Sequence, residues 1–179
     1  PMIQHLIDTV DSFQSSKTSV VVGYKSSEVE RNLISQKKLR FVKQKNQLGT
    51  AHAVKQALPD IRKNSISVVL YGDVPLVKKN TLNRLIKPAS KGKLALLTFI
   101  KEDPTGYGRI IRSSRKNVQK IIEHKDASSA EKEISEVNSG IFAIKANLLQ
   151  QFISKIKNNN KANEYYLTDL IEIASNHSV

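Results

Sequence analysis

Ile66-Ser67-Val68-Val69-Leu70-Tyr71-Gly72-Asp73-Val74-Pro75-Leu76 is the stretch that decides the fold. Its β-branched, apolar first half is typical of a short buried strand. Gly72 and Asp73 end this strand, and Pro75 has no backbone N–H with which to continue a sheet. The stretch therefore predicts a carboxylate at the carboxyl end of a central strand, where open α/β sheets bind ligands. That carboxylate, beside a glycine, suits a divalent cation that holds phosphates, and the alternative is an ordinary Gly-Asp turn.

The composition is that of a globular chain. Its 179 residues, of which 39% are hydrophobic, are enough for one domain with a sizeable core. The absence of cysteine excludes a disulfide scaffold, a cysteine-based zinc site and a cysteine nucleophile. No apolar run approaches the ~20 residues of a membrane span. We see no signal peptide at the start, so we expect a cytoplasmic protein without a membrane partner.

The chain is strongly basic, with 29 Lys and Arg against 16 Asp and Glu and a net charge of +13. Such a surplus favours anionic partners. Basic residues are densest at 37–45 and 112–116, but they are not interleaved with the aromatic side chains that stack on bases. We therefore expect a solvated basic surface and no specific nucleic-acid partner. A non-catalytic, basic nucleic-acid-binding module is the alternative, and salt-dependent binding to random DNA would support it.

Helical and strand patterns alternate on both sides of the central stretch. Apolar spacing predicts a helix over residues 2–10, and Ser27 with Glu30 fits a capping box at the start of another. Strands are predicted at 18–24 and 39–42, and this alternation indicates a mostly parallel central sheet. Further helices are predicted at 50–58, 81–86, 148–156 and 167–174, and further strands at 94–100, 108–111, 118–123 and 137–144.

A second candidate site segment, residues 44–50, lies between a predicted strand and a helix. The Gln44 amide offers donors and an acceptor that match the edge of a planar base. Gly49 admits close approach, and the helix N-terminus beyond it favours anions. The alternative is a loop that starts the helix, with Thr50 as its cap.

Other polar segments border the later strands. In residues 103–109, two glycines flank a tyrosine, which suits either a loop that binds a sugar or a hairpin turn. Glu123 and Asn138 sit beside apolar strands, where they either bind sugar hydroxyl and amide groups or are solvated at a strand edge. His52 and His124 have no partners at the spacing of a zinc site or a catalytic triad. We expect both histidines to be structural or solvated.

Six of these segments, in this order, resemble the N-terminal uridylyltransferase domain of the bifunctional bacterial enzyme that makes UDP-N-acetylglucosamine. The resemblance implies a Rossmann-like α/β nucleotidyltransferase fold with a mostly parallel central sheet. Asp-Pro-Thr-Gly-Tyr-Gly and Glu-Tyr-Tyr-Leu-Thr-Asp favour this family over another sugar-nucleotide pyrophosphorylase or a cytidylyltransferase. The matching segments are residues 44–53, 71–76, 103–110, 123–127, 137–141 and 164–169.

The activity implied by the resemblance is transfer of UMP from UTP to N-acetylglucosamine 1-phosphate, which gives UDP-N-acetylglucosamine and pyrophosphate. The product is a precursor in cell-wall biogenesis, for peptidoglycan and lipopolysaccharide. The implied chemistry is in-line attack on the α-phosphorus without a covalent enzyme intermediate, with Asp73 as the catalytic ligand of Mg²⁺. The implied binding residues are Gln44, Gly49 and Thr50 for uracil, Tyr71, Gly72 and Asp73 for the rest of the nucleotide, and Gly108, Glu123 and Asn138 for N-acetylglucosamine.

The resemblance also predicts how much of the family's domain this sequence contains. The family opens with a strand and a glycine-rich loop that carries Arg and Lys, and neither is found within these 179 residues. The same holds for the family's second metal ligand, an asparagine, and for the hexapeptide repeats of its acetyltransferase β-helix domain.

We therefore expect residues 1–179 to be a partial uridylyltransferase domain, truncated at both ends, without the β-helix domain and with little or no activity alone. Full-length members of the family are expected to form homotrimers through the β-helix domain. A degenerate, non-catalytic paralogue is the alternative.

Overall fold

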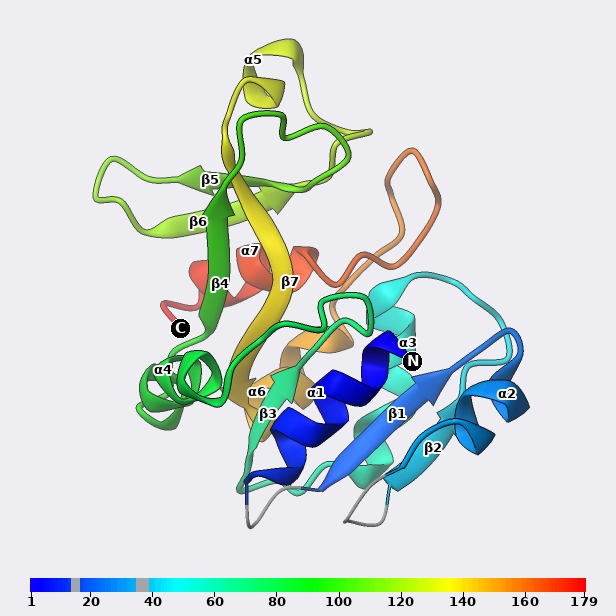
Figure 1. The fold of residues 1–179 in the computed structure, drawn as a ribbon. Coiled ribbons are helices and arrows are strands. Elements are labelled where there is room, and N and C mark those ends of the chain that lie inside the picture. Colours follow the sequence, from blue (N-terminus) through cyan, green and yellow to red (C-terminus); the bar gives the residue numbers. More distant parts are fainter. Residues whose placement is uncertain (14–16, 35–38) are drawn as a thin grey trace.

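The computed structural model describes residues 1–13, 17–34 and 39–179, which form an α/β structure (Figure 1). Helices and strands alternate as predicted, and most lie within a few residues of their predicted positions. The first half contains α1 (Met2–Asp11), β1 (Thr18–Val22), α2 (Ser26–Arg31), β2 (Leu39–Lys43), α3 (Thr50–Ala57), the 3₁₀ turn η1 (Leu58–Asp60) and β3 (Ile66–Val69). The second half contains α4 (Lys79–Ser90), β4 (Ala95–Ile100), β5 (Arg109–Arg112), β6 (Val118–Ile122), α5 (Ser129–Lys132), β7 (Glu136–Lys145), α6 (Ala146–Ile153) and α7 (Asp169–Asn176).

The strands form two sheets in the described part of the chain. β1 and β2 pair in parallel, and the other five strands form a sheet in the order β3-β7-β5-β6, with β4 also paired to β7. The α/β class is confirmed, but the prediction of a mostly parallel central sheet is wrong for strand pairing. β3 and β4 point in the same direction, yet β7 runs antiparallel to both and lies between them. Every ladder of the five-stranded sheet is therefore antiparallel.

β7, and not β3, occupies the central position. β3 pairs only with β7 in the described residues, and its side chains are half-buried. β7 is buried on both faces, because the run Ile141–Ile144 is at most 3% exposed. Alternate side chains of a strand point to opposite faces, so Ile141 packs toward α4 while Phe142 packs toward α6 and α7. The predicted central strand therefore lies at the end of the sheet.

α1 connects the two sheets. Leu6 packs into the cluster that β3, α4 and β7 share, and Ile7 packs against Val20 and Val22 of β1. Figure 1 shows this first helix, in dark blue, beside both β3 and β1. The helix predicted for residues 2–10 is confirmed, and its apolar side chains pack into two separate clusters.

The predicted capping box at Ser27 is wrong. α2 begins at Ser26 after Lys25, which has a left-handed backbone, so Ser27 lies inside the helix and caps nothing. A capping box forms instead at α5, where the Ser128 hydroxyl accepts from the Glu131 N–H and the Glu131 carboxylate accepts from the Ser128 N–H. Within the described ranges, no helix is long and apolar enough to cross a membrane.

Candidate active site

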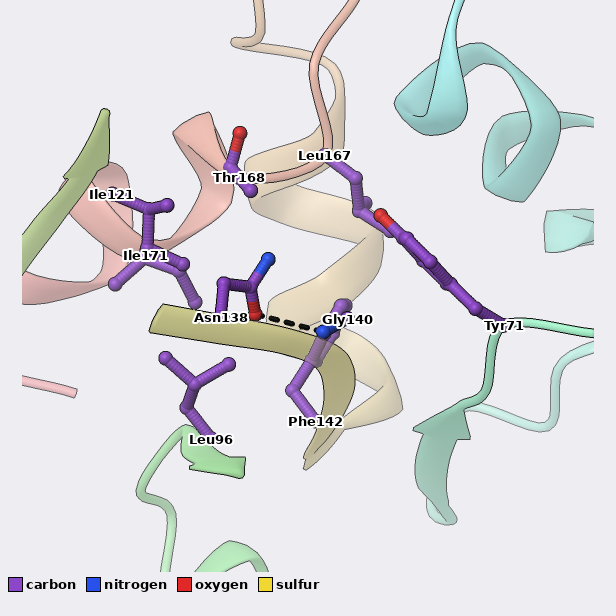
Figure 2. Close-up of a pocket in the computed structure, with 9 residues that line it drawn as sticks. All are labelled: Tyr71, Leu96, Ile121, Asn138, Gly140, Phe142, Leu167, Thr168 and Ile171. Carbon is purple, nitrogen blue, oxygen red and sulfur yellow. Dashed lines mark hydrogen bonds between the residues drawn. The ribbon is translucent and has the colours of Figure 1, made fainter. Parts of the chain in front are cut away.

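Two of the predicted site residues, Tyr71 and Asn138, line a small hollow beyond the end of β3 (Figure 2). Its free volume is about 10 Å³, which is room for no more than one water molecule. The hollow is therefore too small to hold a substrate, and a substrate would have to bind above it. A larger cavity of about 330 Å³ lies between α4 and β4, but it contains none of the predicted site residues. The hollow is lined by Tyr71, Leu96, Ile121, Asn138, Gly140, Phe142, Leu167, Thr168 and Ile171.

Tyr71 packs its ring directly on Gly140. Gly140 has φ +77°, and a Cβ atom there would lie 2.6 Å from the Tyr71 ring. Burial raises the pKa of the Tyr71 hydroxyl, and a hydrogen bond with Thr50 opposes this effect. Tyr71 therefore closes one wall of the hollow, as Figure 2 shows, and is a neutral side chain at physiological pH.

Asn138 presents a free amide nitrogen to the hollow. Its Oδ1 accepts a hydrogen bond of 2.9 Å from the Gly140 N–H. Its Nδ2 points toward Thr168 in Figure 2 and has no hydrogen-bond partner among the described residues. The backbone N–H of Asn138 donates to the Gly108 carbonyl at 2.9 Å. The side chain is thus held in place by its oxygen, and its two N–H donors are available to a ligand.

Glu123 lies directly after β6, on the same side of the hollow. Thr168 Oγ1 donates to Glu123 Oε1 at 2.9 Å. Burial raises the pKa of Glu123, the Thr168 hydrogen bond lowers it, and nearby Asp126 raises it further. Gly108 admits this packing, because a Cβ there would lie 2.8 Å from Ile121 and 3.5 Å from both Glu123 oxygens. The structure therefore brings Gly108, Glu123 and Asn138 together, because they border the adjacent strands β5, β6 and β7.

The remainder of residues 103–109 forms a turn. Asp103 Oδ1 accepts from the Thr105 N–H at 3.0 Å. Hydrogen bonds from the side chain and the backbone of Thr105 lower the pKa of Asp103. Tyr107 packs edge-on against Phe99 with ring centroids 5.6 Å apart. This segment is therefore an exposed turn, but not a hairpin turn, because β4 and β5 each pair with β7 and not with each other.

Two residues to which the sequence gave no role border the hollow. Thr168 orients Glu123, and Asp169 begins α7 beside it. Burial raises the pKa of Asp169 to about 6, with smaller contributions from Glu172, Glu123 and Asp126. The only sequence signal was their place in the Glu-Tyr-Tyr-Leu-Thr-Asp segment, because no periodicity brings residue 168 close to residue 123.

Asp169→Asn is expected to stabilise the fold at high pH. The folded-state pKa of about 6 lies above the ordinary value of 3.8, so the folded state binds more protons between these values and its stability falls as pH rises through that window. With allowance for partial solvent screening, we expect the variant to be about 1–2 kcal/mol more stable at pH 8.

Urea unfolding at pH 4 and pH 8 measures this effect. The stability difference between the variant and the wild type should shrink to a small fraction at pH 4, where Asp169 is protonated in the folded state and only partly ionised in the unfolded state. Glu30→Gln on exposed α2 serves as the control and should show no such pH-dependent gain. An equal gain at both pH values would contradict the raised pKa of Asp169.

The residues predicted to bind a base are partly committed to other contacts. Gly49 has φ +110°, and a Cβ there would lie 2.6 Å from the Tyr165 carbonyl oxygen. Thr50 Oγ1 accepts from the Leu167 N–H at 2.9 Å. Gly49, and not Thr50, is the N-cap of α3, so the alternative in which Thr50 caps this helix is wrong in that detail. Gly49 packs against the Tyr165 backbone and Thr50 bonds Leu167, so both residues hold the start of α3 against residues 165–167.

Gln44 lies beside the start of α3. Its Nε2 donates to the Gly49 carbonyl at 3.1 Å and lies 2.9 Å from His52 Nδ1. The sequence predicted that His52 is structural or solvated, and it did not predict this contact with Gln44. Burial raises the pKa of the Tyr71 hydroxyl and Thr50 lowers it, which places the start of α3 beside the hollow.

Gly72 and Asp73 lie in the exposed turn after β3, which the Val74 N–H closes onto the Tyr71 carbonyl at 3.2 Å. Asp73 makes no side-chain hydrogen bond or ion pair to any residue that the structure describes. No group of three or more His, Cys, Asp or Glu side chains suited to a metal occurs in those residues. One free carboxylate nevertheless fits Mg²⁺, which keeps several waters and takes one or two carboxylates together with substrate phosphates.

Comparison with known proteins identifies the family. The sequence matches the model of the nucleotidyl transferase family over residues 1–178. The chain belongs to the nucleotidyl transferase family. As a nucleotidyl transferase, it shares this fold with solved UDP-glucose pyrophosphorylases. One, in complex with UDP-glucose, has a TM-score of 0.75 at 17% identity over 99% of this chain and 75% of its own, and the apo form has a TM-score of 0.74 at 16% identity over 96% and 74%.

Curated relatives of this nucleotidyl transferase confirm the resemblance to the bifunctional enzyme. The bifunctional protein GlmU of Cellvibrio japonicus is 44% identical over 97% of this chain. That of Ruthia magnifica is 47% identical over 97%, and that of Nitrosomonas eutropha is 46% identical over 100%. The chain spans 38–39% of the length of these relatives.

Proposed function

We propose that this nucleotidyl transferase transfers UMP from UTP to N-acetylglucosamine 1-phosphate, with release of UDP-N-acetylglucosamine and pyrophosphate. The observation that carries the proposal is that Tyr71 and Asn138 line one hollow whose wall residue Thr168 bonds Glu123, beside the turn that holds Asp73. The names and identities of the curated relatives support the same reaction. On this basis the product serves cell-wall biogenesis, and the enzyme works in the cytoplasm.

The sugar half of the site supplies complementary polar groups. The free N–H donors of Asn138 suit the carbonyl oxygen of an acetamido group. One carboxylate oxygen of Glu123 accepts from Thr168, and the other can accept a hydrogen bond that a sugar hydroxyl donates. Gly108 leaves the space beside Glu123 open. This chemistry supports N-acetylglucosamine as the sugar.

The nucleotide half consists of Gln44, Gly49 and Thr50 for uracil, with Tyr71 and Gly72 beside the rest of the nucleotide. Asp73 would hold Mg²⁺, which supplies positive charge against the phosphates when bound. Because the sugar phosphate itself attacks the α-phosphorus, the protein's part is to position both substrates and stabilise charge. No side chain of the site is required as a covalent nucleophile.

We also propose that residues 1–179 are part of a uridylyltransferase domain, and that a β-helix domain would account for trimer formation. This proposal is supported by the length of the relatives, because the chain spans only 38% of the Cellvibrio japonicus protein. The free edge of β3 and the separate β1–β2 sheet are consistent with a strand that the described residues lack.

The 179-residue chain by itself is expected to release little or no pyrophosphate from UTP, N-acetylglucosamine 1-phosphate and Mg²⁺. The physical reason is that these residues contain no glycine-rich loop with Arg and Lys to hold the triphosphate. The measurement is a coupled pyrophosphate assay on this chain and on the protein produced from the complete gene, which should be active. Comparable turnover by the two proteins would contradict the proposal of a partial domain.

Another sugar-nucleotide pyrophosphorylase is the second candidate, and the fold shared with UDP-glucose pyrophosphorylase favours it. Replacing N-acetylglucosamine 1-phosphate with glucose 1-phosphate in the same assay separates the two. A nucleic-acid-binding module has less support, because the basic segments are partly paired. Arg112 bonds Glu136 through two nitrogens at 2.6 and 2.7 Å, and Arg40 bonds Asp60 at 2.7 Å. Lys37 and Lys38 of the first basic segment lie outside the described residues.

A further inference from the structure

The orientation of the Gln44 amide is determined by its neighbours. The Gly49 carbonyl oxygen lies 3.1 Å from one amide terminus, and a carbonyl oxygen can only accept a hydrogen bond. That terminus must therefore be the NH₂ group, Nε2. The same nitrogen lies 2.9 Å from His52 Nδ1, which takes its second hydrogen. Both donors of Gln44 are thus used inside the protein.

These contacts also fix the tautomer of His52. Nδ1 must carry a lone pair to accept from Gln44, so the ring proton of the neutral imidazole lies on Nε2. His52 Nε2 is 3.2 Å from the terminal amide of Gln56, one turn further along α3. In the structure, the Gln56 amide nitrogen faces the ring and also donates to the His52 backbone carbonyl at 3.4 Å, a longer bond than either bond of Gln44. Turning the Gln56 amide over gives up only this long bond and presents its oxygen to the Nε2–H. His52 is therefore held on both sides by glutamine amides.

The remaining polar atom of Gln44 is its carbonyl oxygen, Oε1. Oε1 has no hydrogen-bond partner among the residues that the structure describes, and the side chain is half-buried. With both amide hydrogens occupied, Gln44 offers a ligand an acceptor and no donor. A glutamine free to rotate by 180° would offer either group.

We propose that His52 is a positioning residue that, together with the Gly49 carbonyl, fixes the Gln44 amide so that only its carbonyl oxygen faces the base. This inference rests on the proposed function, in which Gln44 contacts uracil. The ring N3–H of uracil is a donor and matches Oε1, whereas the ring N3 of cytosine is an acceptor and opposes it. His52 thereby selects uracil over cytosine without contact with the base.

Base discrimination is the readout that a merely structural role would not change. The ratio of kcat/KM for UTP to that for CTP is measured in the protein produced from the complete gene. In His52→Ala, the Gln44 nitrogen keeps only its 3.1 Å bond to the Gly49 carbonyl. The amide then turns over more readily and donates to cytosine, so we expect the ratio to fall by about fivefold. The change should lie mainly in KM for the nucleotide. An unchanged ratio would overturn the inference.

Two variants in the same helix control for damage to α3. His52→Asn can place an amide oxygen near the position of Nδ1, accept from Gln44 and restore most of the discrimination. Lys55→Ala, on the exposed face of α3, should leave the ratio unchanged. Equal loss of discrimination in His52→Asn and His52→Ala would contradict a role for the acceptor at Nδ1.

An NMR measurement separates this inference from the proposed function. In the same protein labelled with ¹⁵N at histidine, the His52 nitrogens should show the Nε2–H tautomer. The Nδ1–H tautomer would overturn the inference even if the enzyme uses UTP. Absence of turnover with UTP in the wild type would overturn the proposed function, while the tautomer would still decide whether His52 fixes Gln44.

Discussion

Asp73→Asn is expected to lower magnesium-dependent turnover by about 100-fold or more, measured in the protein produced from the complete gene. The substitution keeps the size of the side chain but removes the negative charge that a Mg²⁺ ligand supplies. Asp73 has no other role in the structure, because it lies exposed in the turn after β3 and bonds no described residue. The fold should therefore be unaffected.

The measurement is initial pyrophosphate release as a function of Mg²⁺ concentration. Asp73→Asn should need a higher concentration of Mg²⁺ for half-maximal rate, as well as having a lower maximum. Glu133→Gln, which removes an exposed carboxylate beside α5, controls for the change in net charge. Unchanged magnesium dependence and turnover in Asp73→Asn would exclude Asp73 as a ligand and leave the Gly-Asp pair as an ordinary turn.

Gly140→Ala is expected to destabilise the fold by about 3 kcal/mol. Two physical effects combine at this position in β7. The φ of +77° is one that a residue with a Cβ rarely adopts, and the added methyl would lie 2.6 Å from the Tyr71 ring. Because Gly140 is buried, the ring and the strand must both move. The free energy of unfolding from urea titration measures the loss.

Gly106→Ala separates the two effects. Gly106 has a similar φ of +83°, but a Cβ there would meet no atom within 4 Å. We therefore expect only the backbone cost of about 1 kcal/mol. Equal losses of stability in the two variants would show that the contact between Gly140 and the Tyr71 ring does not contribute to the free energy of unfolding. The difference between them thus measures how tightly Tyr71 is held against the floor of the hollow.

Much of the local structure could be predicted because it depends on neighbouring residues. Apolar spacing placed α1, and the apolar run at 137–144 placed β7 within one residue at each end. The strand at 66–71 was also correct in its start, although pairing stops at Val69. Helix starts were less accurate, because the N-cap of α2 is Lys25, two residues before the predicted cap, and Ser27 therefore lies inside the helix.

The pairing of the strands could not be predicted in the same way. Alternating strands and helices indicate parallel pairing for strands that are joined by helical crossovers, and this pattern does not show where a strand from a distant part of the sequence will insert. Here β7, which comes last in the chain, inserts between β3 and β4, and its burial on both faces makes it the centre of the sheet. That outcome depends on contacts between residues about 75 positions apart, such as Val69 and Phe142.

The sequence by itself determined the family, the class of chemistry and the positions of the polar residues, because motif order and hydrophobic spacing are properties of the chain. Tertiary structure alone decided what each polar atom is free to do. Asn138 and Gln44 are both amides beside strands, yet the Gly140 N–H occupies the oxygen of one, while Gly49 and His52 occupy the nitrogen of the other. Asn138 is left as a donor and Gln44 as an acceptor. Hydrogen bonds are directional and each atom has few of them, so only the folded arrangement assigns these roles.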